Sequence, residues 1–225
     1  MAHIPVPPSL QEVEVGPSRL PGDLVVPERA IGVVAFAHGS GSSRHSPRNR
    51  QVAAVLHRHR LATLLFDLLH ATEARERDLR FDIPLLAARM VAAVDHLAAL
   101  PACSGLPLGL FGASTGSAAA LIAAAERPAA VSAVVSRGGR PDLAAARLPE
   151  VRARCLLIVG GDDPEVLALN RQALRLLTCE AALRVVPGAT HLFEEAGALD
   201  AVAEMAADWF ASTWRMAGAA HASRP

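Results

Sequence analysis

The feature that most constrains the fold is a regular alternation between short apolar runs and longer segments of helical periodicity, from Ile31 to Trp214. Each apolar run has the length of a strand buried on both faces, and the longer segments repeat apolar residues every three or four positions. Strict alternation of this kind predicts a mostly parallel central sheet flanked by helices on both faces, with right-handed crossovers. We therefore expect an α/β fold.

The expected elements follow from this pattern. Strands are predicted at Ile31–Ala37, Ala62–Phe66, Leu108–Phe111, Ala130–Val135, Cys155–Val159 and Ala182–Val186. Helices are predicted at Pro47–His59, Ile83–Leu100, Ser117–Ala125, Glu165–Leu177 and Leu199–Trp214. Before Ile31, two short strand-like segments, Val13–Val15 and Asp23–Pro27, flank a cluster of turn residues, which predicts a short antiparallel edge at the N-terminal side of the sheet.

Length and composition bound the domain organisation. The chain has 225 residues, of which 52% are hydrophobic and 20% are charged, so it can bury one full core. No repeat or long linker divides it, and we expect one domain over residues 1–225. Residues 1–10 and 216–225 are expected to be loosely ordered tails.

The charge balance and the apolar pattern exclude several functions. The formal net charge is zero and the chain has no lysine, whereas a nucleic-acid-binding protein usually carries a basic excess on one face. The N-terminus lacks the pattern of a signal peptide, and no apolar stretch is long enough to span a bilayer. We expect a soluble, cytoplasmic protein that binds neither nucleic acid nor membrane and is a monomer or a homodimer.

The three cysteines, Cys103, Cys155 and Cys179, are scattered along the chain. None of them forms a C-x-x-C pair, so neither a disulfide framework nor a zinc site is indicated. Cys155 lies in an apolar strand and is expected to be a small buried hydrophobic residue.

The segment Gly112-Ala113-Ser114-Thr115-Gly116 is a G-x-S-x-G pentapeptide between a predicted strand and a predicted helix. In a strand-to-helix elbow, glycines two residues before and after the serine leave room where a side chain would strike neighbouring elements. Ser114 is therefore a candidate nucleophile. A serine that only caps the following helix would fit the same pentapeptide.

Candidate partners follow later strands. Asp162 and Asp163 end the strand at Cys155–Val159, where one carboxylate can reach the site and the other can cap the next helix. His191 follows the last predicted strand and is the best placed of nine histidines to act as a base. Because the carboxyl ends of parallel strands share one edge of the sheet, we expect these groups to meet Ser114 there.

The segment His38-Gly39-Ser40-Gly41 follows the first long apolar strand. A glycine-rich loop at this place can supply one backbone N–H to an oxyanion hole, and the residue after the nucleophile supplies the second. The predicted donors are the N–H groups of Ser40 and Thr115. His38 is expected to brace the loop by hydrogen bonding rather than to act as a base.

These motifs resemble those of α/β-hydrolases of the dienelactone-hydrolase-like group. The resemblance rests on H-G-S-G at 38–41, G-x-S-x-G at 112–116, G-G-x-D-x-x-V at 160–166 and G-x-x-H at 188–191. It implies the α/β-hydrolase fold and a triad of Ser114, Asp163 and His191, in the chain order of that superfamily. It also places the acid at Asp163 rather than Asp162.

The resemblance implies ester hydrolysis through an acyl-enzyme, with no metal or organic cofactor. True dienelactone hydrolases use a cysteine nucleophile, so Ser114 argues against dienelactone turnover. Aspartate would be needed at position 114 of a haloalkane dehalogenase or an epoxide hydrolase. An acyltransferase or thioesterase could use the same triad, and a non-catalytic binding module could keep the same fold.

The interval from Val135 to Cys155 holds only a short loop and a brief helix, so no lid domain is expected after the sixth strand. An open, shallow site favours small, soluble esters as partners. Arg137 and Gly41 are the predicted substrate contacts, although Arg137 could instead pair with Asp142. Arg44, Arg48 and Arg50 are expected either to bind an anionic group or to be solvated.

Overall fold

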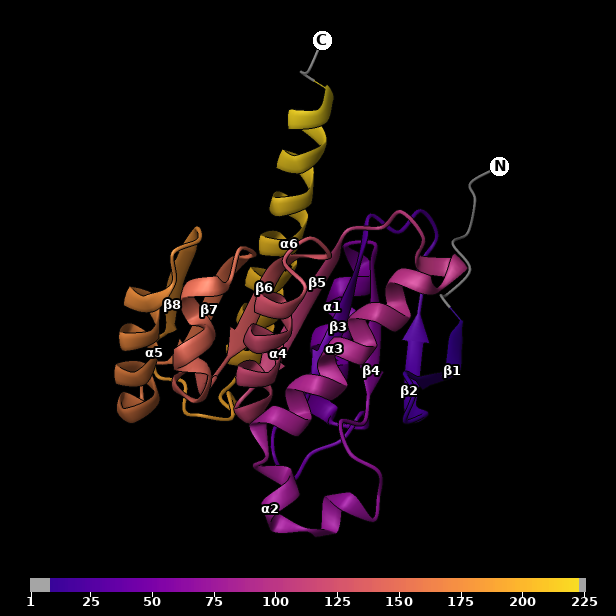
Figure 1. The fold of residues 1–225 in the computed structure, drawn as a ribbon. Coiled ribbons are helices and arrows are strands. Elements are labelled where there is room, and N and C mark those ends of the chain that lie inside the picture. Colours follow the sequence, from indigo (N-terminus) through magenta and orange to yellow (C-terminus); the bar gives the residue numbers. More distant parts are fainter. Residues whose placement is uncertain (1–8, 223–225) are drawn as a thin grey trace.

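The computed structural model describes residues 9–222, with side chains to residue 215. Within that range one sheet has the strand order β1-β2-β4-β3-β5-β6-β7-β8 (Figure 1). Its strands are β1 (Leu10–Val15), β2 (Leu20–Val25), β3 (Gly32–Ala37), β4 (Leu61–Phe66), β5 (Leu108–Ala113), β6 (Val131–Arg137), β7 (Arg154–Gly160) and β8 (Ala181–Val186). The β1–β2 and β2–β4 pairs are antiparallel, and every other pair is parallel. The predicted mostly parallel sheet with an antiparallel N-terminal edge is confirmed.

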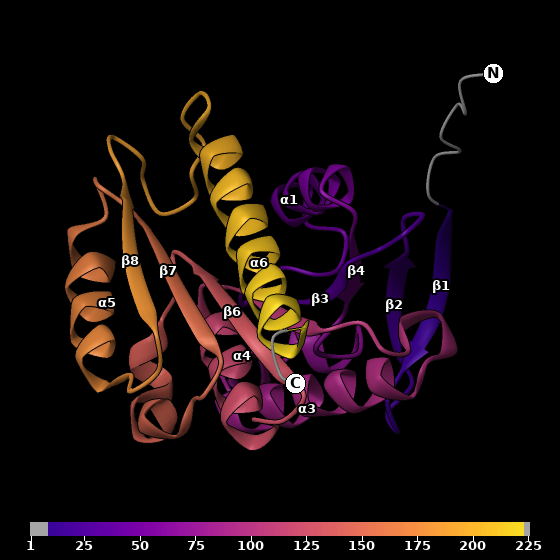
Figure 2. The same cartoon turned by 90° about the horizontal axis from the view of Figure 1, so that it is seen from above.

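The long helices cover both faces of this sheet (Figure 2). They are α1 (Pro47–Arg58), α3 (Ile83–Ala99), α4 (Thr115–Glu126), α5 (Pro164–Leu176) and α6 (Ala198–Ala222). The shorter elements are α2 (Arg77–Arg80) and three 3₁₀ segments, η1 (Glu73–Arg75), η2 (Pro101–Cys103) and η3 (Pro141–Glu150). α1 and α6 cover one face, whereas α3, α4 and α5 cover the other.

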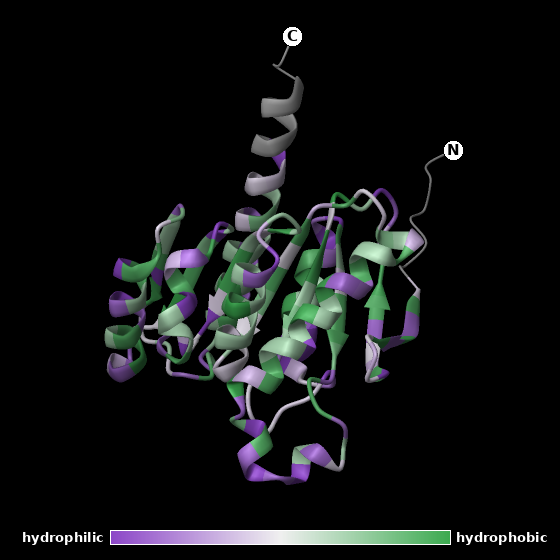
Figure 3. Cartoon of the chain, viewed as in Figure 1, coloured by the Kyte–Doolittle hydropathy of each residue, from purple (hydrophilic) through white to green (hydrophobic). Residues whose placement is uncertain are grey.

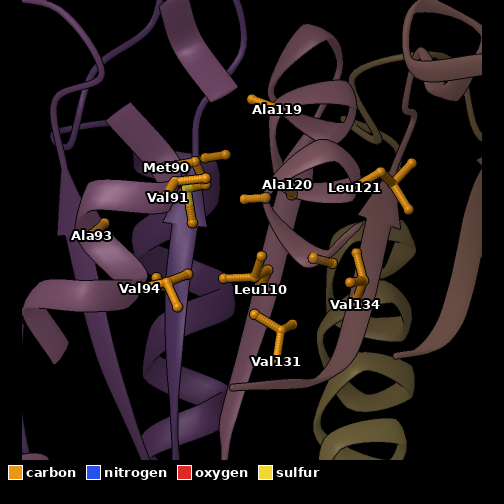
Figure 4. Packing of buried hydrophobic residues seen from close by; sticks show 14 of the residues in the cluster. Met90, Val91, Ala93, Val94, Leu110, Ala119, Ala120, Leu121, Val131 and Val134 are labelled. Atoms are coloured by element: carbon orange, nitrogen blue, oxygen red, sulfur yellow. The ribbon is translucent and has the colours of Figure 1, made fainter. Parts of the chain in front are cut away.

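Strands β3, β4 and β5 are buried along their whole length, as their continuous apolar sequences predict. Figure 4 shows one side of the core, where residues of α3 and α4 pack against β5 and β6. Leu110 of β5 and Val134 of β6 contribute to this layer, and Met90 of α3 and Leu121 of α4 belong to the same buried cluster on the helix side. A second apolar cluster lies under α1 and α6 on the opposite face.

The predicted tails differ from the structure where it describes them. Leu10 belongs to β1, because it pairs with Val25 in the antiparallel ladder. Residues 216–222 continue α6, as their alanine-rich sequence favours. The rest of the predicted tails, residues 1–8 and 223–225, lies outside the described residues. No helix between residues 9 and 222 has the length and apolar character that crossing a bilayer requires.

The connection between β4 and α3 contains η1 and α2 and projects beyond the carboxyl edge of the sheet (Figure 1). Figure 3 shows this connection as largely hydrophilic, unlike the strands. Long-range contacts hold it: Arg89 of α3 forms an ion pair with Glu73 at 3.1 Å, and His70 contacts the carbonyl of Ser18 at 2.9 Å. Between β6 and β7 lies only η3, so the predicted absence of a lid domain there is confirmed.

Candidate active site

Ser114 lies between the last residue of β5 and the first residue of α4. Its φ of +50° and ψ of −123° are outside the regions that a side chain prefers, so this turn is strained. The Ser114 backbone is fixed by three hydrogen bonds: its N–H donates to Arg137 O at 3.2 Å, and its O accepts from Arg140 N and from Ser117 N, each at 3.1 Å. The Ser114 side chain makes no capping hydrogen bond to the described part of α4, so the explanation as a simple helix cap is wrong.

The two glycines of the pentapeptide are required by backbone contacts. A Cβ at Gly112 would lie 2.4 Å from Ser117 Cα, and a Cβ at Gly116 would lie 2.3 Å from Ala37 O. Both distances are far below van der Waals contact. The start of α4 therefore packs directly on the ends of β5 and β3, and this packing holds Ser114 at the edge of the sheet.

Asp163 and His191 meet at the same edge. Their closest atoms, Asp163 Oδ2 and His191 Nδ1, are 2.7 Å apart, as expected for a charge-assisted hydrogen bond. The Asp163 side chain is 14% exposed and the His191 side chain is 39% exposed. Asp162 is exposed, and only its backbone N–H is engaged, with Ala189 O at 3.0 Å. The structure thus brings Asp163, and not Asp162, to the histidine.

Ser114 and His191 share a neighbour but no hydrogen bond among the described residues. Their common neighbour is the end of β6 and the residue after it: Arg137 O accepts from Ser114 N, and a Cβ added at the next residue, Gly138, would lie 3.1 Å from His191 O. A Cβ at Gly138 would lie 3.6 Å from His191 Cε1. The imidazole and the serine therefore flank one short stretch of backbone.

The glycine-rich loop after β3 lies directly against Ser114. A Cβ at Gly39 would be 3.1 Å from Ser114 Cβ. The N–H of Ser40 donates to Thr115 Oγ1 at 2.9 Å, and Thr115 is 4% exposed. The N–H of Thr115 is at the first position of α4, where a helix offers no internal acceptor. Both predicted oxyanion donors are thus near Ser114, and the Thr115 side chain links them.

His38 braces this loop, as predicted. Its Nε2 accepts a hydrogen bond from Leu68 N at 3.0 Å, so the ring proton is on Nδ1 and donates to Gly39 O at 3.0 Å. Burial lowers the pKa of His38 below its ordinary value, which keeps the ring neutral. The contact with Leu68 ties the end of β3 to the end of β4.

A cavity of about 450 Å³ adjoins the loop. One wall is the loop itself, including Gly39, Ser40 and Gly41. Another wall is the β4–α3 connection, which contributes Leu68, Leu69, Ala71, Ala74 and Arg80. The sequence analysis does not predict this wall, because it considers a lid only between β6 and β7. The length of the segment between Phe66 and Ile83 is the available signal, since most strand-to-helix loops have only two to six residues.

The structure contradicts one of the two predicted roles of Arg137, the pairing with Asp142. Asp142 pairs with Arg140, at 2.7 Å, so the predicted alternative partner of Arg137 is wrong. Arg137 is 8% exposed, and its Nη1 has no hydrogen-bond partner among the described residues. Burial and the nearby charge of Arg48 lower its pKa to about 10. Because Ser136 of the same strand points toward Ser117 of α4, the Arg137 side chain leaves the sheet on the opposite face.

The other arginines singled out by sequence have carboxylate partners. Arg44 pairs with Asp67 and with Asp23, the latter at 3.3 Å. The partners of Arg48 and Arg50 are Glu194 and Asp23, each at 3.2 Å. Because the partners lie far apart in the sequence, no local pattern predicts these ion pairs. Among the described residues, no cluster of three or more His, Cys, Asp or Glu residues is arranged to hold a metal ion.

Comparison with known proteins assigns the family. Residues 63–218 match the model of the dienelactone hydrolase family, and the chain belongs to this family. A crystal structure of dienelactone hydrolase from Anabaena variabilis is 56% identical, covers 94% of this chain and 99% of its own, and superposes with a TM-score of 0.89. At 14% identity, Est1E from Butyrivibrio proteoclasticus shares the fold, with a TM-score of 0.73 over 90% of this chain and 99% of its own.

A curated relative carries a different name. A Mycobacterium tuberculosis protein, named provisionally as a phosphoribosyl transferase, is 56% identical over 202 residues. The match covers 89% of this chain but only 46% of that protein. The chain therefore spans about half the length of this curated relative.

Proposed function

We propose that this chain is a serine hydrolase that cleaves small carboxylic esters through an acyl-enzyme intermediate. The observation that carries the proposal is the strained backbone of Ser114 at the strand-to-helix elbow. Its φ of +50° combined with a ψ of −123° lies outside even the left-handed helical region, and such strain is typical of a serine nucleophile presented at the edge of the sheet. The Asp163–His191 hydrogen bond at the same edge supports it.

In the proposed mechanism, the N–H group at His191 Nδ1 donates a hydrogen bond to the Asp163 carboxylate and keeps its proton. This bond leaves Nε2 unprotonated and able to take the proton of Ser114 as the serine oxygen attacks the ester carbonyl. The tetrahedral intermediate collapses, His191 returns the proton to the departing alcohol, and the acyl group stays on Ser114. Water, activated by His191, then releases the acid.

The N–H groups of Ser40 and Thr115 would stabilise the oxyanion, each by about 3 kcal/mol. In the free protein, Ser40 N donates to Thr115 Oγ1 instead. We propose that this hydrogen bond holds the donor over Ser114 until the carbonyl oxygen of the substrate replaces the Thr115 hydroxyl.

The cavity beside the loop supports small, largely apolar substrates. Leu69, Ala71, Ala74 and Leu86 give it an apolar lining, and Gly41 brings backbone to its surface. We retain Gly41 as a substrate contact. The burial of Arg137 gives no support to direct contact with substrate. We propose instead that Arg137 has a structural role inside the protein.

Phosphoribosyl transfer is not part of this proposal. The name applies to a whole protein of which this chain spans 46%. Acyl transfer and thioester hydrolysis would use the same groups and differ in the acceptor or in the acyl donor. Competition between water and added alcohols or thiols, measured as product partition, distinguishes these reactions.

Labelling with a fluorophosphonate probe tests the proposal. The wild-type protein is expected to react and the Ser114→Ala variant to stay unlabelled. Ser104→Ala, an exposed serine outside the site, is the matched control and should react like the wild type. Equal labelling of wild type and Ser114→Ala would refute the nucleophile. A series of p-nitrophenyl esters of increasing acyl length then tests substrate size, and a preference for long chains would contradict the small cavity.

A further inference from the structure

His191 is carried by the loop between β8 and α6, residues 187–197, which we call the histidine loop. The start of this loop lies directly on the end of β7. A Cβ at Gly160 would lie 2.2 Å from Ala189 O, and Ala189 O accepts a hydrogen bond from Asp162 N at 3.0 Å. These contacts fix the backbone two residues before His191.

The residue immediately before His191 is held by a carboxylate from the other end of the loop. Glu195 Oε1 accepts two hydrogen bonds from Thr190, one from its backbone N–H at 3.1 Å and one from its Oγ1 at 2.6 Å. Phe193 N donates to Thr190 O at 3.2 Å. One carboxylate oxygen thus closes residues 190–195 into a compact turn that contains His191.

Phe193 fixes this turn to the core and to the neighbourhood of Ser114. Its side chain is 2% exposed and belongs to the apolar cluster under α1 and α6, and its φ of +55° is unfavourable for a bulky residue. A Cβ at Gly138 would lie 3.4 Å from Phe193 Cε2 and 3.1 Å from His191 O. The turn therefore lies against the residue that follows β6, whose last backbone carbonyl binds Ser114 N.

Glu195 and its neighbour Glu194 have different environments. Glu195 is half-buried, and its backbone carbonyl accepts from Ala198 N at 3.0 Å at the start of α6. The hydrogen bond from the Thr190 side chain and those from backbone N–H groups lower the pKa of Glu195, against a smaller opposing effect of desolvation. Glu194 is exposed and pairs with Arg48 at 3.2 Å. Glu194 is therefore a matched control for Glu195.

We propose that Glu195 is a positioning residue for His191, an inference that rests on the proposed ester hydrolysis. Asp163 orients the imidazole ring through Nδ1, whereas Glu195 fixes the backbone from which the ring extends, by way of Thr190. Backbone position matters because the imidazole has to reach Ser114, and a misplacement of about 1 Å can lower a rate about 100-fold.

Steady-state hydrolysis of p-nitrophenyl acetate by the full chain tests the proposal. Glu195→Ala should lower kcat about 10- to 100-fold and leave KM little changed, because the substrate contacts are kept. Glu195→Gln keeps an oxygen that can accept from Thr190 and should retain most of the rate. Glu194→Ala should have the wild-type rate. The urea unfolding midpoint is measured for every variant and should stay near that of the wild type.

A second substitution tests the same contact from the donor side. Thr190→Val removes the Oγ1 donor and keeps the backbone N–H, so it should lower kcat less than Glu195→Ala does. In the double variant, the valine should add little to the loss caused by Glu195→Ala, because both changes act on one interaction. This pair keeps the proposal testable even if Glu195→Ala folds poorly.

Four results would overturn the positioning role: a wild-type kcat in Glu195→Ala, an equal loss in Glu194→Ala, a loss confined to KM, or fully additive losses in the double variant. Fluorophosphonate labelling of the wild type is measured separately. Absence of labelling at Ser114 would refute the proposed function itself, whereas normal labelling together with a wild-type rate in Glu195→Ala would refute only the role of Glu195.

Discussion

The centre of the sheet and its β7–β8 edge position their reactive groups by different means. At the centre, the position of Ser114 is set by the backbone. Ser114 has a positive φ, and a Cβ added at Gly116 would lie only 2.3 Å from Ala37 O, so the start of α4 packs closely on β3. At the edge, His191 is oriented by a side-chain hydrogen bond to Asp163 at 2.7 Å, and 39% of its side chain is exposed.

This difference teaches where function and stability are coupled. A change at the centre alters the contact between α4 and β3, so it should affect folding and activity together. Removing a side-chain hydrogen bond from the partly exposed histidine should affect activity alone. The variants below are chosen to break or sharpen that distinction.

The largest effect on activity is expected for Asp163→Asn. Loss of the carboxylate removes the acceptor that fixes the His191 tautomer, and kcat on p-nitrophenyl acetate should fall about 10⁴-fold, as in a comparable triad. The free energy of unfolding in urea should change by less than about 1 kcal/mol, because the pair is partly exposed. Asp162→Asn is the matched control and should keep most of the activity. Equal losses in the two variants would contradict the assignment of the acid.

At the centre, Gly116→Ala should lower the free energy of unfolding by about 3 kcal/mol and reduce activity as well, because the added Cβ forces α4 away from Ala37 O. The control is Gly161→Ala at the end of β7, where the new Cβ would lie 3.3 Å from Gly188 N. Its effect should be smaller, because the neighbouring backbone needs to shift by only a few tenths of an ångström. A Gly116→Ala variant with wild-type stability would remove the basis of the comparison.

Sequence reasoning predicted the centre better than the surroundings of the site. Apolar runs and glycine motifs are local signals, so the prediction at Leu108–Phe111 matches β5 and Ser114 falls at its end. The family motif predicts Asp163 as the acid, and Asp163 contacts His191. Ion pairs such as Glu73–Arg89 join residues distant in sequence, so no local pattern reveals that the polar β4–α3 connection is ordered.

The same reasoning explains the error on the partner of Arg137. A residue next to a strand end can be placed on the correct edge from sequence, but the direction and partner of a long side chain depend on the packed elements around it. Asp142 lies close in sequence to both Arg137 and Arg140, and only the structure shows that Arg140 takes it. The burial of Arg137 likewise follows from the packing of two faces and has no local signature.

A smaller effect is expected at Thr115, which links the centre to the glycine-rich loop. Thr115→Val removes the acceptor for Ser40 N and should lower kcat about 10-fold, with KM little changed, because the donor is no longer held over Ser114. Thr115→Ser keeps the hydroxyl and should restore most of the rate. A valine variant that is faster than wild type would show that the hydroxyl blocks the donor instead of positioning it.

The smallest effect is expected at His38 and is visible in the dependence of stability on pH. Burial lowers the pKa of His38 in the folded protein, so the unfolded chain binds a proton first as the pH falls below about 6.5. Folding stability contributed by this group is therefore present above the unfolded pKa and is lost as pH falls toward the folded pKa. Burial lowers the pKa of His57 and His96 too, so they add to the loss with the same sign.

Replacing His38 separates its share from theirs. His38→Asn should cost about 1 kcal/mol of unfolding free energy at pH 7, since the brace between Leu68 N and Gly39 O is lost. It should also flatten the decline between pH 7 and 5 by up to about 1.4 kcal/mol per pH unit, because one titrating group has gone. His45→Asn, at an exposed position, is the control and should keep the wild-type slope. Parallel pH profiles for wild type and His38→Asn would mean that the brace does not depend on a neutral ring.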